Sequence, residues 1–149
     1  MARNEDFDAL DRVVAETLDF IDGPGRSAGT RIDEWGTKEV LIHFLYFHEA
    51  TAWGVLSTSV GGPVWTVPAD WDKINEISVL LHKDESVDDL LAQLRAAQAR
   101  LRNAFASAAD LNQPVMQRPN GKLASASERL MRIKRHWEEH LEELKSLSA

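Results

Sequence analysis

One stretch near the C-terminus, residues 125–147, reads SASERLMRIKRHWEEHLEELKSL. Its apolar residues recur every three or four positions, which is the spacing of one face of an α-helix. That face consists of Leu130, Ile133, Trp137, Leu141 and Leu144. Ser125 followed by Glu128 has the spacing of a capping box at the start of a helix. The stretch therefore predicts a long amphipathic helix that packs one side against a core.

Two histidines lie within this predicted helix. His136 and His140 are four residues apart, so they point the same way from the helix, along the edge of its apolar face. Two imidazoles directed at a core suggest a third ligand from another helix. The chain has five histidines, so the remaining candidates are His43, His48 and His82.

Three more segments show helical spacing of apolar residues: 5–22, 36–57 and 86–109. Glycine and proline follow the first segment at residues 23–25 and the second at residues 61–63, where they end the helices. Ser86, with Asp89 in the first turn, is a favourable start for the third segment. Apolar residues cover more than half the circumference of segment 36–57, so we expect this helix to be central and mostly buried.

The connections complete the predicted fold. Residues 58–85 form a long crossover connection with a short helix at about 70–81, for which an alternating strand at 77–82 is the weaker alternative. We interpret residues 26–34 and 112–120 as loops. The sequence therefore predicts one domain, residues 1–149, of the all-α class, built as a four-helix bundle with a short extra helix between its second and third long helices.

Composition excludes several classes of protein. The 149 residues carry a net charge of −7 without a basic run, which argues against a nucleic-acid partner. The absence of cysteine excludes disulfides, cysteine-ligated zinc and thiol nucleophiles from the chain itself. No apolar run approaches the roughly 20 residues of a membrane span, and the charged N-terminus is unlike a signal peptide. We expect a cytoplasmic protein without membrane contact.

His43 is our choice for the third ligand, because it shares a stripe with Val40 and Phe47 that should face inward. His48 is rotated away from that stripe, and we expect His82 to lie in solvent. Neutral imidazoles are good ligands for divalent transition metals, and three of them leave a position for water or substrate. The alternative is ordinary: paired histidines among glutamates occur on surface helices without metal, and a lone core histidine is usually hydrogen-bonded.

A family resemblance supports the metal site. Residues 35–44, WGTKEVLIHF, resemble the opening of the second helix in the DinB/YfiT-like superfamily, and residues 136–140, HWEEH, resemble the histidine pair on its last helix. Residues 71–75, WDKIN, and 86–91, SVDDLL, are similar to its DinB/DfsB branch. The resemblance implies a four-helix bundle with a three-histidine site for zinc or nickel, in which His43, His136 and His140 match the ligand positions. Gly36 departs from the usual serine or threonine.

Other side chains have two interpretations each. Glu39, Glu49 and Glu139 are candidates for partners of the ligands or for a general base, although a solvated helix face explains them as well. Trp65 and Trp71 either cover a pocket above the metal or close the end of the core. There is no glycine-rich phosphate loop and no G-x-S-x-G nucleophile motif. No catalytic residue beyond the metal ligands is assigned.

These observations predict a divalent-metal-dependent enzyme, a hydrolase or a thiol-dependent transferase that acts on a small electrophilic molecule in stress response or detoxification. Because the chain lacks cysteine, the thiol would be a low-molecular-weight cofactor. The alternatives are a non-catalytic bundle that binds or sequesters a small molecule, and an interaction protein. We expect a small-molecule substrate or ligand and a homodimer.

Overall fold

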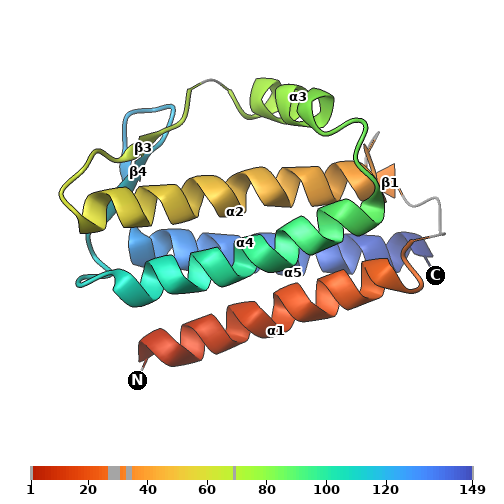
Figure 1. The fold of residues 1–149 in the computed structure, drawn as a ribbon, viewed down its shortest axis with the longest axis horizontal. Helices are drawn as coiled ribbons and strands as arrows, with labels where there is room; N and C mark the ends of the chain where they lie inside the picture. Colours follow the sequence, from red (N-terminus) through yellow and green to blue (C-terminus); the bar gives the residue numbers. More distant parts are fainter. Residues whose placement is uncertain (1, 27–30, 33–34, 69, 149) are drawn as a thin grey trace.

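Five helices make up most of the described part of the chain in the computed structural model, which describes residues 2–26, 31–32, 35–68 and 70–148. The four long helices are α1 (Ala2–Asp22), α2 (Thr37–Ser59), α4 (Val87–Ser107) and α5 (Ala126–Ser148). The short helix is α3 (Trp71–Leu81), which lies beyond α2 (Figure 1). The prediction of a predominantly helical chain, with these helices at these places, is confirmed.

The helix starts follow the local signals of the sequence. Ser125 Oγ accepts a hydrogen bond from the backbone N–H of Glu128 at 3.1 Å, just before α5 begins. Ser86 and Asp89 form a complete capping box at α4. Asp70 accepts from the backbone N–H of Lys73 at 2.8 Å and so caps α3. These bonds satisfy backbone donors that would otherwise lack a partner at a helix start.

Short strands are a correction to the purely helical expectation. β1 (Arg31–Ile32) pairs antiparallel with β2 (Trp35–Gly36). β3 (Trp65–Thr66) pairs parallel with β4 (Pro114–Gln117), which pairs antiparallel with β5 (Leu123–Ser125). The sequence predicted loops or connections at β1, β3 and β4 and no strand at β2 or β5, because strands of two to four residues show no usable periodicity. The predicted connector 26–34 lies partly outside the described residues.

The three-stranded sheet packs closely against α2. A Cβ atom on Gly54 of α2 would lie 2.6 Å from the backbone oxygen of Val115 in β4, and 3.3 Å from Cβ of Trp65. Glycine is therefore required here, because any side chain would force the helix and the sheet apart. This contact places Trp65 against the C-terminal half of α2.

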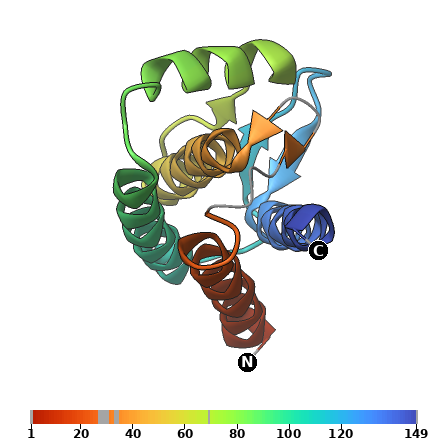
Figure 2. The ribbon, with the colours of Figure 1, turned by 90° about the vertical axis from the view of Figure 1, so that its right-hand side faces the viewer.

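The core lies between the four long helices, which Figure 2 shows nearly end-on. As predicted, α2 is central: it contacts α3, α4, α5 and the sheet. Its inward side chains are fully buried or nearly so, and they include Val40, Leu41, Ile42, Phe44 and Val55. In the described part of the chain, no helix combines the length and the apolar character needed to cross a membrane.

Candidate metal centre

The structure brings together the three histidines that the sequence singled out. His43 comes from α2, and His136 and His140 come from α5. The Nε2 atoms of His43 and His136 are 2.8 Å apart, and those of His136 and His140 are 2.9 Å apart. One ring nitrogen from each residue lies within 4.8 Å of the other two. The three rings thus direct one nitrogen each toward a common point.

Aromatic packing next to the histidines fixes how α2 and α5 face each other. Phe44 stacks on Trp137 with ring centroids 3.8 Å apart and the planes 6° from parallel. Both side chains are almost completely buried. Since Phe44 follows His43 and Trp137 follows His136, this stack determines where the two imidazoles meet. Apolar core packing therefore positions the polar site.

Asn75 of α3 determines which nitrogen of His43 carries a proton. Its side-chain oxygen lies 2.8 Å from His43 Nδ1. An amide oxygen only accepts hydrogen bonds, so Nδ1–H is the donor, and Nε2 of the neutral ring keeps its lone pair. That lone pair faces His136 and is available to a metal ion. Sequence reasoning did not assign this role to Asn75.

Burial keeps the three imidazoles unprotonated. Desolvation lowers the pKa of His43 to about 4. It lowers the pKa of His136 to about 2, with further lowering from His43, His140 and two arginines. The pKa of His140 is also lowered by burial, although the charge of Glu143 opposes the change. All three rings are therefore neutral near pH 7, which is the form that binds metals.

Protons alone do not satisfy this cluster. His43 Nε2 presents a lone pair to His136 Nε2, so a favourable contact requires a proton on His136 Nε2. His136 Nε2 then has no lone pair to accept a bond from His140. His140 Nδ1 is buried and makes no hydrogen bond within the described part of the chain; Glu143 Oε2 lies 3.5 Å from it, without hydrogen-bond geometry. A cation that accepts three lone pairs would resolve this conflict.

The donor set fits a divalent transition ion. Tetrahedral zinc with Zn–N distances of about 2.0–2.1 Å places its nitrogen ligands about 3.3 Å apart. The His43–His136 and His136–His140 nitrogens would need to separate by only about half an ångström to reach this spacing. Three neutral imidazoles suit zinc, nickel, copper or iron better than magnesium or calcium, which prefer oxygen ligands.

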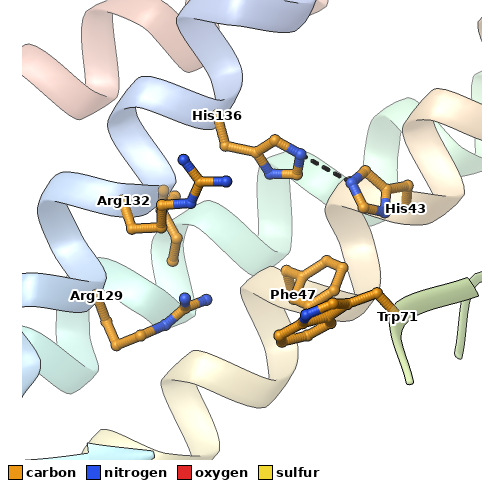
Figure 3. A pocket seen from close by; sticks show the side chains of 7 residues that line it. His43, Phe47, Trp71, Arg129, Arg132 and His136 are labelled. Carbon is orange, nitrogen blue, oxygen red and sulfur yellow. Dashed lines mark hydrogen bonds between the residues drawn. The ribbon is translucent and has the colours of Figure 1, made fainter. Parts of the chain in front are cut away.

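A cavity of about 170 Å³ lies beside the histidines. Figure 3 shows His43 and His136 at one side, Phe47 and Trp71 at another, and two arginines extending from α5. Its lining consists of His43, Phe47, Trp71, Arg129, Arg132, Ile133 and His136. Trp71 lines this cavity, which agrees with the first of its two interpretations. Trp65 is instead buried, with its ring 6.0 Å from Cζ of Arg129.

The other two histidines lie elsewhere. His48 is directed away from the cluster, as predicted, and its Nε2 lies 2.7 Å from Oε1 of Gln98 on α4. His82, which we expected in solvent, is partly buried and its Nδ1 is hydrogen-bonded to Glu85. Helical periodicity did not predict this contact, because it forms in the turn after α3.

The three glutamates considered as partners of the ligands or as a general base lie outside the lining of the cavity. Glu49 pairs with Arg100 near the surface, which agrees with the solvated-face interpretation. Glu139 is exposed, and its charge only partly opposes the lowering of the His140 pKa by burial. Glu39 lies in the first turn of α2. None of the three lines the cavity beside the histidines.

Comparison of the chain with models of known protein families, with curated proteins and with solved structures gives no match. The functional interpretation therefore depends on the geometry of the chain itself.

Proposed function

We propose that His43, His136 and His140 hold a divalent transition metal ion, zinc or nickel, and that the protein is a metal-dependent enzyme for a small electrophilic molecule. The observation that carries this proposal is the convergence of three neutral imidazole nitrogens beside a cavity large enough for a small ligand. Reactions that fit are hydrolysis and the transfer of a low-molecular-weight thiol.

The ligands are prepared for this role by their surroundings. Asn75 holds His43 in the tautomer that exposes the Nε2 lone pair, and the Phe44–Trp137 stack fixes the distance between α2 and α5. A bound ion would supply Lewis acidity, which lowers the pKa of a water or thiol molecule. Phe47 and Trp71 line one side of the cavity.

The proposal extends to the family resemblance and to the finer fold class. We propose a four-helix bundle of the DinB/YfiT-like type, with α3 on the crossover connection. The order of the long helices and the long connection between α2 and α4 support this assignment. Further support comes from the positions that match the family's ligands, since all three meet at one point.

One observation favours the non-catalytic alternative. The lining of the cavity contains no carboxylate and no hydroxyl group among the described residues, so it offers no general base apart from the histidines. A protein that binds or sequesters a small molecule needs no such group. Measurements of turnover separate the two functions.

The primary test is the metal content of protein purified without a histidine tag. We expect about one zinc or nickel ion per chain in the wild type and none in His140→Ala. His82→Ala is the matched control, because it removes a histidine outside the cluster and should leave the metal content unchanged. Wild-type metal content equal to that of His140→Ala would contradict the proposal.

The second test is turnover. The metal-loaded protein should hydrolyse p-nitrophenyl acetate, or conjugate free cysteine to an activated aryl chloride, faster than His140→Ala does. Equal rates with these probes, together with stoichiometric metal binding, would support the binding alternative.

A further inference from the structure

Arg129 is a buried cation at the cavity beside the histidines. Only 7% of its surface is exposed, and it lies on α5 two turns before His136. Its Nη2 donates a long hydrogen bond of 3.3 Å to Thr51 Oγ1. Its Nε is buried and has no hydrogen-bond partner in the described part of the chain. A guanidinium group in this position has unused donor capacity.

The charges around Arg129 increase its need for an anion. Among the residues that the structure describes, no carboxylate lies at ion-pair distance from Arg129 or from its cavity neighbour Arg132. The charged groups that act on Arg129 are Arg118 and Arg132, both cations. Burial, with a smaller contribution from these two cations, lowers the pKa of Arg129 to about 10, so Arg129 stays charged at neutral pH. A buried charge without a counter-ion destabilises the fold.

This local excess of positive charge is unusual in a chain of net charge −7. Five other arginines are paired with carboxylates; they are Arg26, Arg95, Arg100, Arg102 and Arg118. The cavity arginines instead extend from α5 toward the space in front of Phe47 and Trp71 (Figure 3). Arg129 and Arg132, neither of which is ion-paired with a described carboxylate, thus line the same cavity.

A purely structural role explains Arg129 less well. The hydroxyl of Thr51 is a neutral acceptor, and the ring of Trp65 lies 6.0 Å away, at the outer limit of a cation–π contact. These two contacts are weak compensation for a desolvated charge. An oxyanion would satisfy both the charge and the free donors, since the guanidinium fork matches the geometry of carboxylate and phosphate.

We infer that this cavity binds a small organic anion, with its oxyanion group held by Arg129 and Arg132 and its apolar body against Phe47 and Trp71. The identification of this anion as a substrate rests on the proposed function of the histidine cluster; its binding does not. The ligand class is a small aromatic or aliphatic molecule that carries one carboxylate or phosphate.

The test uses three probes of similar shape on protein freed of metal by a chelator: benzoate, phenyl phosphate and neutral benzamide. We expect calorimetry to show that the preferred anion binds at least roughly tenfold more tightly than benzamide, because charge-assisted hydrogen bonds are strong. The order of benzoate and phenyl phosphate identifies the oxyanion. Equal affinity for all three probes, or no binding of any, would overturn the inference.

Arg129→Met should remove the preference for the anion. Arg135→Met is the matched control, because Arg135 is exposed on the same helix and does not line the cavity; it should bind as the wild type does. The Tm of Arg129→Met should be unchanged or higher, since methionine keeps the length of the side chain and removes the buried charge. A large drop in Tm, or failure to fold, would indicate a structural role instead.

Arg132→Gln gives a second test that does not depend on a buried position. Arg132 is exposed, so this variant should fold normally and bind the anion several-fold more weakly; unchanged affinity would count against the inference. Zinc titration of the same proteins separates the two proposals. Anion binding without metal binding would refute the proposed function alone, whereas metal binding without anion binding would refute the anion site alone.

Discussion

His43 and His48 lie less than two turns apart on α2, yet their surroundings give them different roles. Burial lowers the pKa of both rings to about 4, so the pKa alone does not distinguish a functional histidine from a structural one. The difference lies in the partners. His48 meets an amide oxygen, whereas the Nε2 of His43 meets another imidazole.

The surroundings of His48 form a complete chain of hydrogen bonds. Its Nε2 donates to Oε1 of Gln98, and Nε2 of Gln98 donates to Oδ1 of Asp11 at 2.6 Å. These bonds connect α2, α4 and α1. The His43 cluster connects α2, α3 and α5, but its donors and acceptors do not match without a cation. Mismatched hydrogen-bond partners, more than burial, therefore distinguish a candidate ligand site from a structural histidine.

The largest expected difference between the two regions is in metal affinity. His136→Ala should weaken zinc binding by more than roughly 100-fold, because the loss of a direct ligand exceeds the 10–100-fold effect of losing an outer partner. His48→Gln should leave the affinity unchanged. Competition with a chromogenic chelator measures both. Similar losses of zinc affinity in the two variants would show that the His43 cluster is not a more specific metal site than His48.

The pH dependence of folding stability tests whether His48 is buried in its neutral form. Its pKa of about 4 in the folded protein is below the unfolded value of 6.5, so unfolding takes up a proton between these values. The stability that neutral His48 supports is present above pH 6.5 and is lost as the pH falls toward 4, by up to about 3 kcal/mol. The groups facing its ring are Gln98, Trp137 and the charge of Glu49.

Urea unfolding of metal-free protein at several pH values measures this effect. The wild type should lose stability more steeply than His48→Gln between pH 6.5 and 4, because glutamine binds no proton in either state. Parallel curves for the two proteins would show that His48 is not buried in its neutral form.

Removal of the hydrogen-bond partner should affect metal affinity at His43 but folding stability at His48. Asn75→Leu should lower zinc affinity about 10–100-fold and change stability little, because it frees the tautomer of His43. Gln98→Leu should lower the free energy of unfolding by about 1–3 kcal/mol, since it leaves buried polar groups unpaired, and should not change zinc affinity. If Asn75→Leu affected stability alone, Asn75 would be a structural partner like Gln98.

The smallest effect is expected at Glu143. Its carboxylate lies 3.5 Å from His140 Nδ1, but its side chain is nearly half exposed. Solvent screening limits such an interaction, so Glu143→Gln should change zinc affinity by less than about threefold. A much larger loss would show that Glu143 orients His140 in the way that Asn75 orients His43.

The sequence predicted the parts of the site that follow from helical periodicity. His136 and His140 share a face because they are four residues apart, and His43 shares a stripe with buried Phe47. The helix bounds agree within a few residues because serine, aspartate and glycine signals are local. The prediction that the three imidazoles bind metal remains a prediction.

The parts that the sequence did not predict depend on contacts between distant segments. Asn75 reaches His43 only because α3 lies over α2, and the pairing of Trp65 with Met116 joins two connections that each resemble loops. Arg129 was missed because a charged residue on an amphipathic helix is normally exposed. Its one signal was its position: it precedes Leu130 and is three residues before Arg132 and seven before His136, on the inward side of the helix.

The helix that carries both arginines and two of the histidines also sets a length scale. With a rise of about 1.5 Å per residue, Arg129 and His136 are offset by about 10 Å along the axis of α5, and Arg132 and His136 by about 6 Å. The spacing of side chains along α5 therefore sets the distance between the group that holds the anion and the imidazoles. A molecule gripped at its charged end would present to the imidazoles an atom several bonds away, so shorter acids would fall short of that point and longer ones would overshoot it.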